Sequence, residues 1–328
     1  MKLEILIPHY NESTEIVRRL LDSIAAQQGV NLKEDIGVII CSDGNGSMIP
    51  WTELETYPFH VEYFGHSHLG VSATRNRLLD SATADYIMCC DCDDVFSNLL
   101  GLYKIIEAID NGGFDMFFSA FYEELVNEDG TKYRYIERRE DAYFVHGKVF
   151  NRKFLVDNCI RWNSELKISG DNYFLWQAIK LADRIQYCPM PFYIWKYNPR
   201  SVCRGEKDHF TKSYYLSIKS NGLTVQNFLD RKRTDIALYF FAGMIYDAYL
   251  TMHTQKWTEL SAGDHAGKAV EIFGEYFNRY KELLTDAPIE IKRQAMNAKA
   301  AARGIMLPDT IMTDAETWAE YICRTKES

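Results

Sequence analysis

The sequence predicts an α/β fold, in which a mainly parallel sheet flanked by helices is followed by a helical C-terminal region. Over about the first 200 residues, short apolar runs of strand length alternate with segments of helical period. Several of these runs are almost wholly apolar, as is typical of strands covered on both faces. From about residue 215 onward the segments are of helix length, so we divide the chain into domains 1–215 and 216–328. A chain of 328 residues is long enough for both.

The first unit predicted is strand, helix, strand. Residues 3–7 form an apolar run that ends at Pro8, and Ser13 follows with the side chain of a helix start. Apolar residues then recur at helical spacing until Gly29, where we expect the helix to have ended. The next apolar run, 36–41, is the second strand.

The alternation continues to a strongly acidic segment. We expect a short strand at 61–64, a helix over roughly 71–82 and a strand at 86–90, which ends in the sequence DCDD. In a parallel sheet, ligands bind beyond the carboxyl ends of the strands. Polar residues at that edge are therefore the first candidates for a functional site.

The C-terminal region is predicted to contain helices at 236–252, 264–285 and 289–303. The first of these is the most membrane-like stretch of the chain, but it contains Asp247 and is too short and polar to cross a bilayer comfortably. We therefore expect a buried helix and no transmembrane segment.

Basic residues gather on the last of these helices. Lys292, Lys299 and Arg303 lie near one face of it, with Arg293 beside them. We expect a solvated face, and the alternative is a surface for an anionic acceptor or a membrane.

Charge and cysteine content limit the partners and the compartment. The formal net charge of -9 argues against broad affinity for nucleic-acid phosphates. The first ten residues lack the cationic start and long apolar core of a secretory signal. No paired CxxC spacing occurs, and Cys89, Cys90 and Cys92 crowd one strand, where bridging is geometrically poor. We therefore expect a cytoplasmic protein with reduced, buried thiols.

The acidic segment after residue 90 is the sharpest single signal. Three carboxylates at the end of an apolar strand need something cationic to offset them. Asp91, Asp93 and Asp94 offer hard oxygen ligands suited to Mn²⁺ or Mg²⁺, which can bridge to phosphate oxygens. The alternative is a helix cap or a charged loop edge, because Asp is common before helices.

An ordered series of motifs over about the first 205 residues resembles the family 2 glycosyltransferases of the GT-A fold. ILIPHYNES resembles the family's first strand and loop, which makes Pro8 and Tyr10 candidates for supporting the nucleotide base. CSDGNGS resembles its acidic loop and places Asp43 where the family binds the base, although Met48 stands near a position where the family often has a further Asp.

The longest of these motifs, GVSATRNRLLDSATADYIMCCDCDD, resembles the family's Arg-Asn helix and the strand that carries its DxD metal motif. By this resemblance Arg75 approaches the donor, and Asp91 and Asp93 hold ribose, diphosphate or metal. An Arg near the positive end of a helix is also a credible anion site on physical grounds. The alternative for Arg75 is a surface salt bridge.

Three later motifs continue the resemblance. HGKVFNRKFL makes Lys148 a candidate donor contact, the alternative being a solvated lysine in a turn. ISGDNYFLWQAIK resembles the segment with the catalytic base, here Asp171, although Gly170 stands where the family usually has Glu. The alternative for Asp171 is a helix cap.

The last motif, PFYIWKYNPRSVCR, resembles the turn that folds over the diphosphate, and the candidates in it are Arg200, Ser201 and Arg204. His209, an additional candidate metal ligand, is left outside the main prediction.

Together these resemblances imply a metal-dependent inverting glycosyltransferase, of the hexosyl or N-acetylhexosaminyl kind, that uses a nucleotide-sugar, with a UDP-sugar as the commonest class. The acceptor is a hydroxyl of a glycan, polymer, lipid or modified nucleic acid. We expect it to bind at 115–165 or on the C-terminal helices, which are also candidates for homo-oligomer contacts. Six rings could stack on sugars, although most of them are expected in the core: Phe117, Phe118, Phe121, Tyr122, Trp162 and Tyr173.

Two other functions compete with this one. A catalytically silent nucleotide- or sugar-binding protein is suggested by Gly170 and by the altered base loop. A nucleotidyltransferase would also carry metal-binding carboxylates in an α/β fold, but such enzymes commonly have a Gly-rich basic loop after the first strand, and PHYNES offers none.

Overall fold

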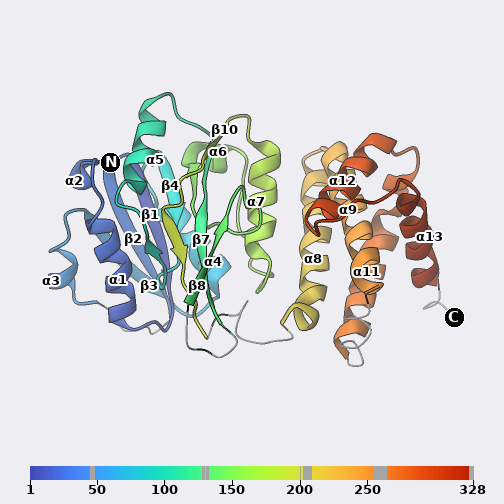
Figure 1. Cartoon of the computed structure of the whole chain (residues 1–328), viewed down its shortest axis with the longest axis horizontal. Coiled ribbons are helices and arrows are strands. Elements are labelled where there is room, and N and C mark those ends of the chain that lie inside the picture. Colours follow the sequence, from blue (N-terminus) through green and yellow to red (C-terminus); the bar gives the residue numbers. More distant parts are fainter. Residues whose placement is uncertain are drawn as a thin grey trace. The chain divides into compact units, whose positions relative to one another are not determined.

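The computed structural model describes residues 1–44, 49–127, 130, 133–199, 201, 209–254 and 264–324. The chain forms two compact units, Met1–Ser201 and Val202–Ser328 (Figure 1). The predicted assignment of catalysis to 1–215 and of acceptor binding or oligomerisation to 216–328 stays a prediction.

A seven-stranded sheet forms the centre of the first unit. In spatial order its strands are β10 (Ile185–Cys188), β6 (Met116–Ser119), β9 (Lys148–Asn151), β4 (Tyr86–Cys89), β1 (Leu3–His9), β2 (Ile36–Asp43) and β3 (His60–His66). The pairs β1–β2, β2–β3, β1–β4 and β6–β10 are parallel, whereas β9 runs antiparallel to both β4 and β6. The predicted mainly parallel sheet is confirmed.

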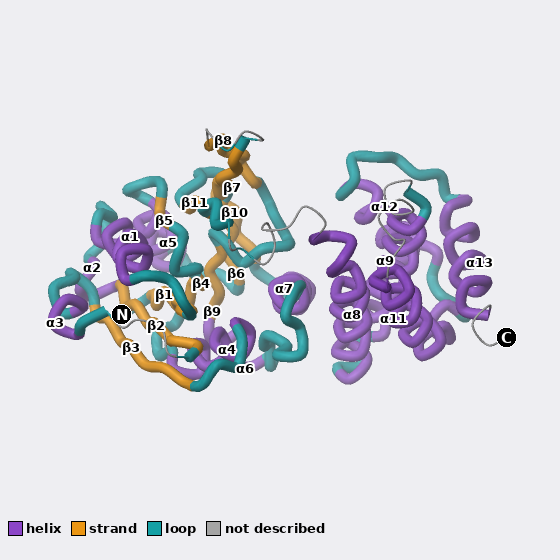
Figure 2. The backbone as a smooth tube through the Cα atoms, turned by 90° about the horizontal axis from the view of Figure 1, so that it is seen from below, coloured by secondary structure: helices purple, strands orange, loops and turns teal. Residues whose placement is uncertain are grey.

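Helices cover both faces of this sheet, as Figure 2 shows from below. Alternate residues of β1 point to opposite faces, so that Ile5 and Leu6 enter two different cores. One core is shared with α1 (Thr14–Ala25) and α5 (Gly101–Asp110). The other is shared with α4 (Val71–Ser81), α6 (Arg152–Asp157) and α7 (Gly170–Leu181). Short helices α2 (Leu32–Asp35) and α3 (Trp51–Leu54) precede β2 and β3. Burial on both faces explains why β1 and β2 are so apolar.

A second, four-stranded sheet lies beside the first. Its order is β5 (Val95–Phe96), β11 (Tyr193–Trp195), β7 (Phe121–Val126) and β8 (Tyr133–Arg138). β11 pairs with β5 and β7, while β8 pairs with β7 alone and forms one edge of the sheet, opposite β5. The acidic segment predicted from sequence therefore lies between β4 of the first sheet and β5 of the second.

The second unit is helical. Its elements are α8 (His209–Asp230), α9 (Thr234–Met252), α11 (Asp264–Tyr280), the 3-10 turn η1 (Lys281–Leu284), α12 (Ile289–Ala301) and α13 (Thr310–Arg324). The three predicted helices are present, but α8 and α13 were not predicted. Ser220, Asn221 and Thr224 are buried in α8, so polar residues interrupt the apolar pattern that announces a helix.

α9 is largely buried, as expected from its composition. Its Asp247 accepts hydrogen bonds from the Tyr214 hydroxyl and the Arg303 guanidinium, each at 2.8 Å. Within the described part of the chain, no helix combines the length and apolar character needed to cross a membrane. The polar residue that argued against a membrane span is thus paired inside the unit.

The basic residues near α12 have acidic partners in the same unit. Besides Arg303, the Lys292 ammonium lies 3.0 Å from Glu316 and the Arg293 guanidinium 3.0 Å from Asp309. Three of the basic side chains are thus neutralised by ion pairs inside the unit. The face expected to be simply solvated is therefore partly engaged in these ion pairs.

Candidate functional site

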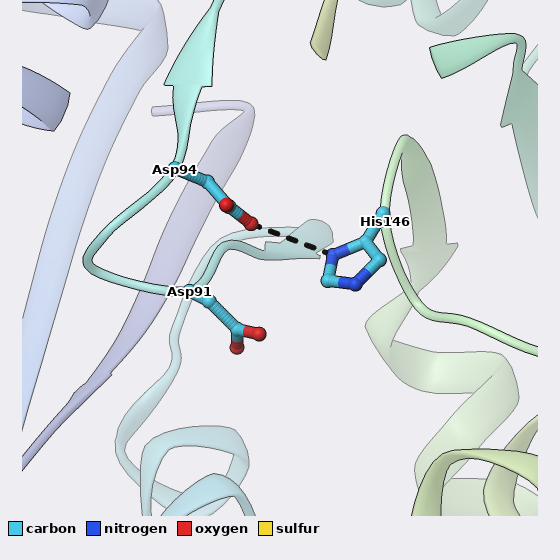
Figure 3. Close-up of side chains that lie close together, drawn as sticks. All are labelled: Asp91, Asp94 and His146. Carbon is cyan, nitrogen blue, oxygen red and sulfur yellow. Dashed lines mark ion pairs between the residues drawn. The ribbon is translucent and has the colours of Figure 1, made fainter. Parts of the chain in front are cut away.

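The acidic loop follows β4 at the edge where the parallel strands end. Asp91 and Asp94 lie on this loop, and His146 faces Asp94 from the segment before β9 (Figure 3). One ligand atom from each of these three residues lies within 4.8 Å of the others. The loop and the segment before β9 therefore bring together two carboxylates and an imidazole, a donor set that suits a divalent cation.

Asp94 ties the acidic loop to the second sheet. It is fully buried, and its carboxylate accepts hydrogen bonds from the Tyr193 hydroxyl at 2.6 Å and the Lys196 backbone N–H at 2.8 Å. The His146 Nδ1 lies 3.6 Å from the same carboxylate. Burial raises the pKa of Asp94 well above its usual value, and the charges of Asp93 and Asp91 raise it further. The two hydrogen bonds from Tyr193 and Lys196 thus occupy two acceptor positions of the Asp94 carboxylate.

Asp91 and Asp93 are more accessible than Asp94. The Asp91 side chain is 31% exposed. Asp93 accepts a hydrogen bond from the Asn198 amide at 2.7 Å, so a residue beyond β11 orients it. Burial raises the pKa of Asp93, and the charge of Asp91 adds to this effect. A bound cation would offset that cost. The close group of possible ligand atoms includes Asp91 but not Asp93, so the role of Asp93 as a metal ligand stays a prediction.

Arg75 links the acidic loop to α7. Its Nη2 lies 2.8 Å from the Asp91 carboxylate and its Nη1 lies 2.5 Å from the Asp171 carboxylate. The residue is 6% exposed. Burial lowers the pKa of Arg75, but the two carboxylates outweigh it and hold the pKa above its usual value. The alternative of a surface salt bridge is wrong, because the Arg75 side chain is buried.

Asp171 lies in the first turn of α7 and faces the acidic loop. Besides the Arg75 pair, its carboxylate accepts a hydrogen bond from the Trp162 indole at 3.3 Å. The N-cap position belongs to Ser169, so the helix-cap alternative is wrong. Burial raises the pKa of Asp171, with Arg75 opposing that shift. A carboxylate with a raised pKa, 19% exposed, has the properties of a general base.

Lys148 lies at the same edge because β9 runs antiparallel and begins there. Its side chain is 1% exposed, and the ammonium donates to the His146 carbonyl at 3.3 Å and lies 3.9 Å from the Asp141 carboxylate. Burial lowers the pKa of Lys148 to about 8, although Asp141 and Asp171 oppose the shift. The alternative of a solvated lysine in a turn is wrong.

Replacing Lys148 by Met is expected to remove a rise in stability with pH. The unfolded chain keeps the Lys148 proton up to a pKa of 10.5, whereas the folded chain releases it near 8, so stability rises between these values. The cost of the buried charge at neutral pH is about 3 kcal/mol. Urea unfolding at about pH 7 and pH 9.5 measures the change in the free energy of unfolding between these pH values. The exposed Lys153 on α6 supplies the control Lys153→Met, and equal pH slopes in the two variants would contradict the account.

The predicted base-binding residues lie at the ends of β1 and β2. Pro8 is buried in β1 opposite Cys41, and Tyr10 is 44% exposed and stacks on His68 at 4.6 Å. Asp43 accepts hydrogen bonds from the backbone N–H groups of Leu69 and Gly70, at 2.6 and 2.9 Å. Asp43 thus holds the loop that leads into α4 and to Arg75.

Three of the predicted residues have limited or no description. Arg200 and Arg204 lie outside the described residues, as does the side chain of His209. Ser201 is described, and its backbone N–H donates to the Asn198 carbonyl at 3.0 Å. The roles of Arg200, Ser201 and Arg204 at a diphosphate, and of His209 as an additional metal ligand, stay predictions.

The rings expected near an acceptor are mostly core residues. Only Tyr122 is half-buried, and the other five are buried: Phe117, Phe118, Phe121, Trp162 and Tyr173. The centres of the stacked Trp162 and Phe174 rings lie 3.7 Å apart, and the Trp162 indole N–H donates to the Asp171 carboxylate.

Sequence reasoning missed several residues that organise the site. Tyr193 and Asn198 both lie in the aromatic motif quoted above, and His146 begins the motif that contains Lys148. The His146 ring is 3% exposed and packs against Phe144 and Trp195. Their polar atoms reach Asp94 or Asp93 only after the two sheets come together, so the order of residues along the chain gave no direct signal.

The first half of the chain matches a known family. Residues 4–170, just over half of the chain, match the family model described as "Glycosyl transferase family 2". A curated relative, the "Uncharacterized glycosyltransferase YibD" of Escherichia coli (strain K12), is 33% identical over 96 residues. The match covers 28% of this chain and 26% of that relative, so the chain matches about a quarter of the relative's length.

Solved structures share the fold over nearly the whole chain. S. aureus TarS 1–349 in complex with UDP matches with a TM-score of 0.63 and 17% identity, covering 99% of this chain and 92% of the other. The chain spans 55% of a longer TarS structure. The mannosyltransferase PcManGT from Pyrobaculum calidifontis, in complex with GDP-Man and Mn²⁺, matches with a TM-score of 0.51 and 14% identity, covering 91% of this chain and 86% of the other. The predicted fold class, with its helical C-terminal region, is confirmed by these likenesses.

Proposed function

Because this chain belongs to glycosyl transferase family 2, we propose that it transfers a sugar from a nucleotide-sugar to an acceptor hydroxyl, with inversion at the anomeric carbon. The observation that carries this proposal is the buried Arg75, whose guanidinium joins the Asp91 carboxylate of the acidic loop to the Asp171 carboxylate of α7. In this proposal Asp91 is the acid on the donor side and Asp171 is the base, and both carboxylates pair with the Arg75 guanidinium. A UDP-sugar is the proposed donor, supported by the TarS structures, which hold UDP and UDP-GlcNAc.

Asp171 is the proposed catalytic base. Inverting transfer needs one carboxylate to take the proton of the acceptor hydroxyl while that oxygen attacks the anomeric carbon. The raised pKa of Asp171 makes it a better proton acceptor than an ordinary carboxylate, and the bonds from Arg75 and Trp162 fix its orientation. The proton therefore ends on the Asp171 carboxylate, and the nucleotide leaves from the opposite face of the sugar.

Asp91 and Asp93 are the proposed holders of Mn²⁺ or Mg²⁺. Asp94 has two acceptor positions engaged by Tyr193 and Lys196, which favours the other two carboxylates as ligands. The alternative set is Asp91, Asp94 and His146. A divalent cation there would supply charge stabilisation for the departing diphosphate. Arg75 and Lys148 bring further positive charge to the same edge, and Arg200, Ser201 and Arg204 are proposed to cover the diphosphate.

Replacing Asp93 by Asn is expected to weaken Mn²⁺ binding by on the order of 100-fold, because even indirect ligand partners cost 10- to 100-fold. Isothermal titration with Mn²⁺ in the presence of UDP measures this. Asp110→Asn, an exposed carboxylate on α5, is the matched control and should bind Mn²⁺ like the wild type. Wild-type Mn²⁺ affinity in Asp93→Asn would remove Asp93 from the ligand set.

A binding protein without turnover is the second candidate, because Gly170 stands where the family usually has Glu. The packing gives Gly170 a different explanation. A Cβ at this position would lie 2.9 Å from the Ser72 hydroxyl, so a larger residue would require the Ser72 side chain on α4 to shift. A glycine at this position is therefore compatible with the close packing of α7 on α4 that accompanies the pairing of Asp171 with Arg75.

A thermal-shift screen tests the donor proposal. UDP-, GDP-, CMP- and dTDP-sugars are compared with Mn²⁺ and with a chelator, because a ligand that binds the folded state raises the melting temperature. We expect the shift to be largest with UDP-sugars and to require the metal. No shift with any of these donors in a folded sample would contradict the proposal.

A further inference from the structure

The edge hairpin of the second sheet carries two of the most exposed aromatic side chains of the first unit. Tyr133 and Tyr135 on β8 are 62% and 51% exposed. Residues two apart in a strand share a face, so both rings lie on the same side of the hairpin. Figure 2 shows β7 and β8 leading away from the seven-stranded sheet.

Two further residues complete this surface. The Tyr122 ring on β7 lies 6.3 Å from the Tyr135 ring in an edge-on arrangement, and the Lys196 ammonium lies 5.7 Å from the centre of the Tyr133 ring. We call Tyr122, Tyr133, Tyr135 and Lys196 the tyrosine face. Its rings come from two paired strands and its cation from the segment after β11.

A buried carboxylate holds the tyrosine face in place. Glu124, 1% exposed, accepts hydrogen bonds from the Tyr135 hydroxyl at 2.7 Å, from the Lys196 ammonium and from the Tyr197 backbone N–H at 3.0 Å. One carboxylate thus fixes a ring and a cation that are both accessible to solvent. Rings fixed before binding lose less conformational entropy when a ligand arrives.

The segment 196–198 connects this surface to the acidic loop. The Lys196 backbone N–H bonds to Asp94 while its side chain bonds to Glu124, and the Asn198 amide bonds to Asp93. The tyrosine face is therefore continuous, through three consecutive residues, with the loop proposed to hold the metal. A ligand lying on it would extend toward the reacting end of the donor.

We propose that the tyrosine face binds the acceptor and that this acceptor is a carbohydrate chain. Sugar rings present faces of C–H bonds, which pack on the electron-rich faces of aromatic rings. Charged groups border the exposed rings, since Lys196 and Glu137 lie beside them, and the half-buried Val126 pairs with Tyr133 on the same face, while Ile136 points to the other side of the strand. A mixed aromatic and polar surface suits a polyol better than the tail of a lipid. This inference rests on the proposed glycosyltransfer.

The rings proposed here to contact the acceptor differ from those expected from the sequence, apart from Tyr122. Five of the six aromatic residues expected to stack on sugars lie within residues 115–165, and the sixth lies in α7. All of them except Tyr122 are buried. Tyr133 and Tyr135 were not among them. β8 is an edge strand in which residues 133–136 are all exposed, so these two rings are accessible.

The test uses the full chain and a double variant, Tyr133→Ala with Tyr135→Ala. Wild type and variant are applied with UDP and Mn²⁺ to an array of neutral and acidic oligosaccharides, and hydrolysis of the UDP-sugar is measured in parallel. We expect wild type to bind at least one oligosaccharide, and the variant to bind it roughly tenfold more weakly or worse. Donor hydrolysis should be unchanged. Tyr321→Ala, which removes a 68% exposed tyrosine from α13, is the matched control and should behave like wild type.

A ring-preserving variant separates stacking from structure. Tyr133→Phe with Tyr135→Phe keeps both rings but removes the hydroxyl that bonds to Glu124, so we expect oligosaccharide binding close to that of wild type. Equal binding by wild type and the alanine variant, or no binding by wild type while donor hydrolysis persists, would overturn this inference alone. Absence of donor hydrolysis in wild type would instead count against the proposed function and, with it, this inference.

Discussion

Replacing Asp171 by Asn is expected to lower the turnover number by about 10²- to 10⁴-fold, the usual contribution of a general base. Asparagine keeps the shape of the side chain but cannot take the proton of the acceptor hydroxyl. The Michaelis constant for the donor should change little, because the lost interaction acts mainly in the transition state. Initial rates of nucleoside diphosphate release, measured with saturating acceptor, give both constants.

The pH profile and a matched variant make this prediction specific. Burial raises the pKa of Asp171, so activity should fall on the acidic side at a pH above the ordinary range for a carboxylate, and this limb should disappear in Asp171→Asn. Asp157→Asn changes an exposed carboxylate on α6 and should keep wild-type activity. Equal turnover in Asp171→Asn and Asp157→Asn would exclude Asp171 as the base.

Replacing Arg75 by Ala is expected to destabilise the folded protein by about 3–5 kcal/mol, as is usual when one partner of a buried ion pair is removed. The Asp91 and Asp171 carboxylates would then face each other without the guanidinium between them. Urea unfolding at neutral pH measures the difference, and two-state behaviour of the first unit must be checked by a second probe.

Arg77 on the same helix provides the control for Arg75. It is exposed, so Arg77→Ala should change stability by less than about 0.5 kcal/mol. In Arg75→Ala the two carboxylates gain raised pKa values, so the folded state takes up protons and its deficit should shrink as the pH falls. A deficit in Arg75→Ala no larger than that in Arg77→Ala would show that this buried link does not stabilise the fold.

Local patterns along the chain account for most of the central sheet. β1 and β2 are almost wholly apolar because both of their faces are covered, and this composition separates them from the amphipathic α1 between them. The acidic residues after β4 were conspicuous for the same reason, since an apolar strand does not end in several carboxylates without a use for them.

Contacts between distant segments could not be predicted in this way. The partners of Arg75 lie 16 and 96 residues away, and those of Asp94 include Tyr193, 99 residues away. The second sheet joins β5, β7, β8 and β11 from separated parts of the chain, and β5 has only two residues. Hydrophobic periodicity cannot find so short a strand, nor can it show that Asp94 and Lys148 are buried.

The most direct test of glycosyl transfer follows the anomeric centre with water as the acceptor. A UDP-α-sugar is incubated with the protein and Mn²⁺, and the released sugar is observed by proton NMR before it mutarotates. A single displacement by an Asp171-activated oxygen predicts UDP together with the β-anomer as the first product. Release of the α-anomer would contradict inversion, and absence of any release from a donor that binds would contradict transfer itself.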